Sequence, residues 1–112
     1  MSIYKILRAD EWAALRRDGA TDGAPIDLAD GFVHLSAGAQ VRETATKHFA
    51  GEQGLMLLAV DEGRLGDRLR WEPSRGGDLF PHLYAPLPLE AVEWAQPLPW
   101  DGTAHRFPEG FA

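Results

Sequence analysis

Two short stretches of the sequence each carry an imidazole and a hydroxyl group two residues apart. The pairs are His34 with Ser36 and His82 with Tyr84. Side chains two residues apart in a β-strand point to the same side of the sheet. Each pair can therefore bind a phosphate or a ribose, or transfer a proton, because imidazole titrates nearest to neutral pH. We identify the two histidines as candidate catalytic residues and the two hydroxyl groups as candidate ligand-binding groups.

A structural role is the alternative for each histidine, which would then lie at the edge of the core and bond to a backbone carbonyl. The presence of both pairs beside a glycine-rich loop, Gly76-Gly77, favours a binding pocket. That loop has neither the dinucleotide-binding fingerprint nor the Walker spacing. A plain turn is therefore the other interpretation of these glycines.

Charged residues flank the same loop. Glu72 ends a stretch of alternating polarity and is a candidate catalytic acid or base, provided that burial or a neighbouring group shifts its pKa. Arg75 is a candidate for binding a phosphate or carboxylate of a ligand, and Arg70 is a further one. For all three residues the alternative is an ordinary charged side chain in solvent.

The remaining histidines do not complete a recognised site. The four histidines, at positions 34, 48, 82 and 105, have no i,i+4 pair and no neighbouring ligand cluster, so no metal site is predicted. The sequence also lacks a Gly-x-Ser-x-Gly motif, so a Ser-His-Asp hydrolase is not supported. His48 falls on the apolar stripe of an expected helix and should lie in the core. His105 falls in the C-terminal tail and should be exposed to solvent.

Composition indicates one folded, cysteine-free domain of 112 residues, of which 45% are hydrophobic. The formal net charge of −6 disfavours non-specific binding to nucleic acids or anionic membranes. The absence of cysteine excludes disulfides and thiolate nucleophiles. With no signal peptide and no apolar run long enough to span a bilayer, we expect a cytoplasmic protein. The sequence does not determine the oligomeric state.

The pattern of apolar residues predicts an α+β fold. A first helix should begin at the N-cap Asp10 and end at Gly19, and a second should lie between Ser36 and Gly51. Residues 18–30 are expected to form a loop, and Pro81 is expected to confine its strand to a sheet edge. The tail from about residue 97 is expected to be irregular. Strands are expected over residues 3–7, 32–36, 55–60, 68–72, 80–84 and 91–95.

The two histidine segments resemble a known family. Asp-Gly-Phe-Val-His-Leu-Ser at residues 30–36, followed by Gln40 and Thr44, and Phe-Pro-His-Leu-Tyr at residues 80–84 carry the likeness. On these residues the chain is identified as a member of the domain of unknown function 952 family of small bacterial and plant proteins, to about Trp94. That family is similar to the ADP-ribosyltransferase superfamily. The resemblance implies a split, mostly antiparallel sheet with two short helices, which grips NAD or an ADP-ribose-like group in a cleft.

The superfamily likeness also implies roles for particular positions. Its first-strand residue, a His or Arg that holds the nicotinamide ribose, corresponds here to Lys5. Its second-strand position falls on His34 to Ser36, and its late-strand carboxylate falls near His82, with Glu72 as a substitute. Lys5 and Gln40 therefore join the candidate ligand-binding residues. Lysine can bond a ribose hydroxyl but has no acceptor nitrogen, and histidine lacks the permanent negative charge of a carboxylate.

Three functions remain open on the sequence. The first is an enzyme acting on NAD, ADP-ribose or another nucleotide phosphate, of the ADP-ribosyltransferase-like or phosphate-handling kind. The second is a non-catalytic nucleotide-binding module that keeps the cleft. The third is a protein-interaction module that uses the aromatic tail between Trp94 and Phe107.

Overall fold

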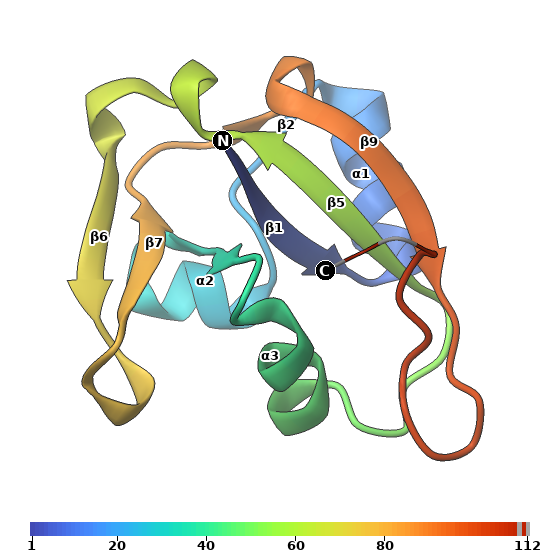
Figure 1. Cartoon of the computed structure of the whole chain (residues 1–112). Coiled ribbons are helices and arrows are strands. Elements are labelled where there is room, and N and C mark those ends of the chain that lie inside the picture. The colour runs from blue at the N-terminus through green and yellow to red at the C-terminus, as the bar shows by residue number, and fades with distance from the viewer. Residues whose placement is uncertain (110, 112) are drawn as a thin grey trace.

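The structure is a computed structural model that describes residues 1–109 and 111, with the backbone alone at position 75. The main sheet has four antiparallel strands. Its strand order is β4-β1-β5-β9. The two central strands are β1 (Ser2–Leu7) and β5 (Leu55–Asp61), and the two edges are β4 (Ser36–Ala37) and β9 (Val92–Leu98). These two strands cover the ranges 3–7 and 55–60 in which the sequence predicts strands (Figure 1).

A second sheet lies beside the first and has the order β3-β7-β6 (Figure 1). Its strands are β3 (Val33–His34), β7 (Leu79–Leu83) and β6 (Leu69–Pro73), again antiparallel. The expected strand over residues 32–36 is therefore divided between two sheets. Leu35 is the crossing point, since His34 pairs with β7 and Ser36 pairs with β1.

Three α-helices and several single turns complete the described chain, so the expectation of two helices is wrong. The helices are α1 (Ala9–Asp18), α2 (Pro25–Asp30) and α3 (Val41–His48). A ribbon of β2 (Ala20–Thr21) and β8 (Leu87–Pro88) and the 3-10 turns η1 (Glu62–Arg64), η2 (Gly66–Arg68), η3 (Arg75–Gly77) and η4 (Leu89–Ala91) connect them. The result is a small α+β domain with mostly antiparallel sheets.

Helix α2 forms where a loop was expected, because its turn-forming residues are placed as helix-end signals. Pro25 opens the first turn, where its missing N–H would have no partner in any case. The Asp27 carboxylate accepts the backbone N–H of Ala24 at 2.7 Å. Gly31, at φ 86°, ends the helix in the left-handed region. Helix α1 begins after Arg8, so Asp10 lies in its first turn and is not its N-cap.

The core has two clusters, one on each side of the main sheet's central strands. Leu58 and Val60 of β5 belong to the first cluster, and Leu57 of the same strand belongs to the second. Alternate residues of β5 therefore face different clusters, which explains why the strand is apolar on both faces. No helix in the described residues has the length and apolar character needed to cross a membrane.

Strand β7 is the middle strand of the second sheet, so the expectation that Pro81 confines it to an edge is wrong. The carbonyl of Pro81 accepts from the backbone N–H of Leu35 at 3.0 Å. The N and O atoms of one strand residue face the same neighbour. The position of the missing N–H of Pro81 therefore faces the end of β3, where few hydrogen bonds between the strands remain to be made.

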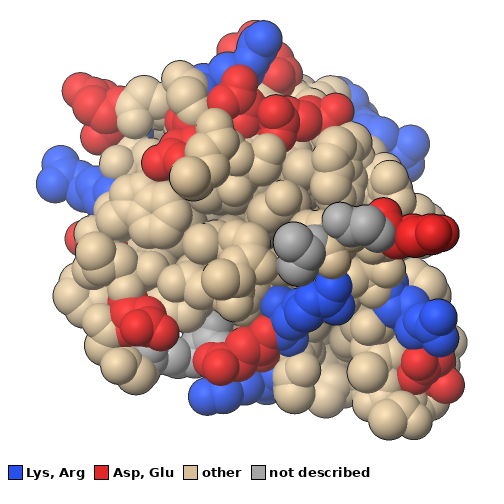
Figure 2. Space-filling view, viewed as in Figure 1, with Lys and Arg blue, Asp and Glu red and all other residues tan. Residues whose placement is uncertain are grey.

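Two further expectations about histidine burial are also wrong. His105 is buried, because its ring lies against Trp100 and its Nε2 is 2.9 Å from the carbonyl oxygen of Glu52. His48, expected in the core, is exposed on α3. The tail also packs through Phe107, which lies against the second core cluster. The face seen in Figure 2 is mostly uncharged, with separate groups of acidic and basic side chains and a gathering of acidic ones at the top.

Candidate functional site

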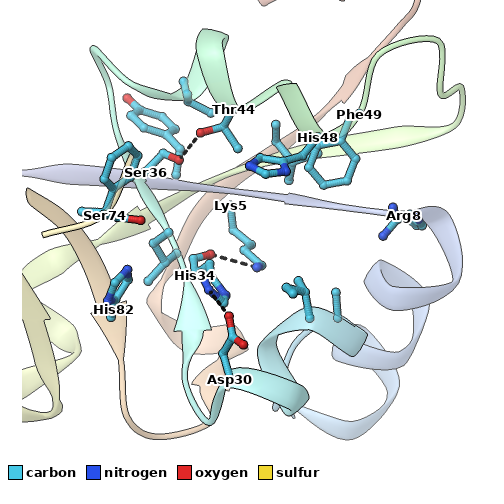
Figure 3. A pocket seen from close by; sticks show the side chains of 17 residues that line it. Lys5, Arg8, Asp30, His34, Ser36, Thr44, His48, Phe49, Ser74 and His82 are labelled. Carbon is cyan, nitrogen blue, oxygen red and sulfur yellow. Dashed lines mark hydrogen bonds and ion pairs between the residues drawn. The ribbon is translucent and has the colours of Figure 1, made fainter. Parts of the chain in front are cut away.

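A pocket of about 490 Å³ lies where the two sheets, α2 and α3 meet. Both candidate histidines, His34 and His82, line it together with Ser36 and Lys5. Figure 3 shows His34 and Lys5 near its centre, with His82 on one side, Arg8 on the opposite side and His48 above Lys5. The two histidine segments that the sequence singled out thus contribute to one hollow, because their strands pair with each other.

Asp27 is the anchor of the wall behind His34 and is only 1% exposed. Its Oδ1 accepts from the backbone N–H of His34 at 2.9 Å and lies 2.6 Å from Nδ1 of the same residue. Its Oδ2 accepts from Lys5 Nζ at 2.8 Å and from the backbone of Ala24. Both carboxylate oxygens are therefore satisfied, and a buried charge is balanced by a buried charge.

These bonds decide the charge of Asp27. Burial acts to raise the pKa of Asp27, but the hydrogen bond from His34 and the charge and hydrogen bond of Lys5 outweigh it. The pKa of Asp27 falls from its ordinary value of 3.8 to about 2. An ionised carboxylate only accepts hydrogen bonds, so the Nδ1 of His34 carries the proton between them.

Lys5 is the counter-ion of Asp27. Burial lowers the pKa of its ammonium group, while Asp27 opposes that shift. Its Nζ also donates to the backbone carbonyl of His34 at 2.8 Å. Lys5 lies in the pocket wall, as expected of a ligand-binding residue, but two of its three donors are already used by the protein.

His82 is held by a carboxylate in the same way. Its Nδ1 is 2.8 Å from Oε1 of Glu72, and the Tyr84 hydroxyl donates to the same oxygen at 2.7 Å. The bonds from Tyr84 and then from His82 lower the pKa of Glu72, and the bond to Glu72 raises the pKa of Tyr84. Glu72 therefore contacts the candidate His82 directly, although it lies outside the described lining of the pocket.

The two imidazoles are neighbours because of the strand register. His34 and His82 are opposite each other in the β3–β7 pair, and directly opposed residues point to the same side. Their ring centroids are 5.6 Å apart. The Phe32 ring stacks on the His82 ring, with 4.1 Å between the ring centroids, and its centroid is 4.5 Å from that of His34. These contacts limit the movement of both imidazoles.

The other predicted residues have varied positions. The Ser36 hydroxyl lines the pocket and is 2.9 Å from the hydroxyl of Thr44. Gln40 bonds the backbone of Ala37 and of Leu79, so it ties α3 to β7. Tyr84 acts through Glu72 and lies outside the described lining of this pocket. The side chain of Arg75 lies outside the described part of the chain.

Sequence reasoning missed three residues of the site, Asp27, Asp30 and His48. Asp27 follows Pro25 by two residues, a spacing typical of the first turn of a helix. This signal could have predicted a helix in place of the expected loop. Asp30 was included only in the family motif, yet its Oδ2 lies 3.0 Å from Nε2 of His34. His48 lines the pocket from α3.

The Asp27–Lys5 pair predicts an asymmetric response to mutation. Asp27→Asn should lower the free energy of unfolding by about 3–5 kcal/mol, because it leaves a buried ammonium group without its counter-ion. Lys5→Met should cost less, since the Asp27 carboxylate that it leaves keeps its bonds to His34 and to the backbone of Ala24. Chemical denaturation of both variants measures the difference. An equal or larger loss for Lys5→Met would contradict this account of the pair.

Asp27 also predicts an acid-dependent loss of stability. Its pKa lies near 3.8 in the unfolded chain and about 2 in the folded chain. The stabilisation is therefore complete above pH 3.8 and disappears as the pH falls through about 2. The difference corresponds to about 2 kcal/mol. Carboxyl NMR titration of Asp27 should give a midpoint about 2, and a midpoint at the ordinary value would refute the assignment.

Comparison with known proteins places the chain in a family. No curated protein matches it. The chain is similar to protein CC0527 from Caulobacter crescentus: its crystal structure is 48% identical, with a TM-score of 0.91 over 95% of this chain and 94% of that one. The solution NMR structure of CC0527 gives 50% identity and a TM-score of 0.82 over 93% and 90% of the two chains. A family model described as a protein of unknown function (DUF952) matches residues 6–95, so the chain belongs to the domain of unknown function 952 family.

Proposed function

We propose that the protein is an enzyme that binds a nucleotide-like phosphate ligand, of the NAD or ADP-ribose kind, and transfers protons at its phosphate. One observation carries the proposal. Two imidazoles with centroids 5.6 Å apart line one pocket, and each has its Nδ1 on a carboxylate. Such bonds fix the orientation and the tautomer of each ring, which an acid/base pair requires.

The chemistry that this pair supports is general acid and base catalysis at a phosphate ester. One imidazole takes the proton of an attacking water or hydroxyl as its oxygen bonds to phosphorus. The other imidazole gives a proton to the leaving oxygen as the old P–O bond breaks. The two rings together gain and lose one proton, so the step is balanced without a redox partner.

The shape of the pocket supports a ligand of nucleotide type. Its volume of about 490 Å³ lies within the usual range for small-molecule sites. Ile6, Val41 and Phe49 supply apolar wall on which a flat ring could pack. The Ser36 and Thr44 hydroxyl groups, which line the same pocket, are suited to a ribose or phosphate.

ADP-ribosyl transfer, which the superfamily resemblance implies, is less well supported than phosphate chemistry. That reaction needs a carboxylate facing the nicotinamide ribose. The nearest candidate, Glu72, accepts from both His82 and Tyr84 through a single oxygen. Lys5, at the ribose-binding position, is held by Asp27. Both groups are therefore already engaged by side chains of the protein itself.

Turnover and binding with ADP-ribose and NAD test the proposal. We expect the wild-type protein to bind ADP-ribose and to release a phosphate-containing or nicotinamide-containing product that chromatography detects. His34→Gln and His82→Gln should each reduce turnover by about 10²-fold or more, the usual contribution of a general acid or base. His105→Gln is the matched control, because that histidine bonds the Glu52 carbonyl away from the pocket.

The possible outcomes separate the functions. Release of nicotinamide from NAD would favour ADP-ribosyl chemistry over phosphate chemistry. Binding that persists without any turnover between pH 5 and 9 would identify the non-catalytic nucleotide-binding module instead. If neither ligand binds at millimolar concentration, the proposed ligand class is wrong.

A further inference from the structure

We propose that the Asp30 carboxylate occupies the place beside His34 where a negatively charged oxygen of the ligand binds. Asp30 thereby competes with the ligand and sets the affinity of the pocket for it. The inference rests on the proposed function, because it takes the ligand to be a phosphate. It adds a specificity-determining residue and the place where the phosphate binds. Figure 3 shows Asp30 next to His34 at the pocket, with the contact between them drawn as a dashed line.

The argument begins with the two nitrogens of His34. Nδ1 lies 2.6 Å from Oδ1 of Asp27, and Nε2 lies 3.0 Å from Oδ2 of Asp30. With Nδ1 committed to the buried carboxylate, Nε2 is the nitrogen that can reach a ligand in the pocket. In this structure the protein's own carboxylate already fills the acceptor position at that nitrogen.

The two carboxylates are held very differently. The Asp27 side chain is 0% exposed and is bonded by Lys5 and by backbone N–H groups as well as by His34. The Asp30 side chain is 45% exposed and sits at the last residue of α2, where the helix carbonyls disfavour a negative charge. Asp27 is therefore a fixed part of the wall, and Asp30 is the carboxylate that can be replaced.

The energy of the contact makes replacement feasible. Contacts between partly exposed polar groups contribute little net free energy because water competes for both partners, so little opposes the departure of Asp30. A phosphate carries up to two negative charges and several acceptor oxygens, so it offers Nε2 of His34 a stronger acceptor than a single carboxylate does. The chemistry at this nitrogen therefore selects an oxyanion, and the geometry assigns Oδ2 of Asp30 as its stand-in.

Removing the competing carboxylate tests this inference. Asp30→Ala should bind ADP-ribose about 5-fold more tightly than the wild-type chain, the equivalent of about 1 kcal/mol. Asp22→Ala is the control, because it removes the same charge from an exposed residue of the same connection. Its effect on affinity should be less than 2-fold by general screening of surface charge. Isothermal titration calorimetry measures all three proteins.

Three probes identify the group that binds. Adenosine, which has no phosphate, should bind equally to wild type and Asp30→Ala. Inorganic phosphate should show the same gain as ADP-ribose. Acetate would show that gain only if the pocket prefers a carboxylate ligand, which would overturn the phosphate assignment. The ¹⁵N resonance of His34 Nε2 should shift on addition of phosphate and should shift on mutation of Asp30, which locates the effect at that nitrogen.

The failures are distinguishable. If wild type binds ADP-ribose and Asp30→Ala binds it equally or more weakly, Asp30 supports the site and does not compete, and the inference is wrong while the proposed function stands. If the Asp22→Ala control gains as much as Asp30→Ala, the effect is only one of net charge, and the inference is again wrong. If neither protein binds any phosphate probe, the proposed function fails and the inference fails with it.

Discussion

The ionised carboxylate of Asp27 is the interaction on which the candidate site depends. It lies inside the protein between the Lys5 ammonium and the His34 ring, and it also accepts from the backbone N–H groups of Ala24, just before α2, and of His34 in β3. One side chain therefore joins the main sheet, the second helix and the second sheet. A buried charge is tolerated only when it is paired and hydrogen-bonded, so the surrounding backbone is constrained to keep these donors in place.

The same principle recurs, in weaker form, across the pocket. Glu72 fixes His82 much as Asp27 fixes His34, but it is more exposed and is supported by Tyr84 instead of a buried cation. Phe32 lies against both rings. The two imidazoles thus share a location but differ in environment.

Much of this arrangement follows from local sequence patterns, and the rest does not. The His-x-Tyr spacing is local, and His82 and Tyr84 do meet at one oxygen of Glu72. The apolar run of β5 is local too, so the long central strand could be anticipated. The division of residues 32–36 between two sheets could not, because it depends on how β3 and β4 find different partners far along the chain. Asp27 was missed for a related reason: an aspartate in a Gly- and Pro-rich stretch is usually a turn residue, and only the tertiary contact with Lys5 makes it a buried anchor. His105 shows the same limit, since its burial depends on Trp100 and on a carbonyl of the 51–54 loop.

The crossing at Leu35 has a consequence for how the two sheets are held together at the pocket. His34, just before the crossing, is attached to β7, and Ser36, just after it, is attached to β1. The pocket is therefore the seam between two independently hydrogen-bonded sheets, joined at this point by a single residue. A molecule that contacts both His34 and Ser36 would link the two sheets. It would resist the sliding of one sheet past the other and make the two sheets unfold together.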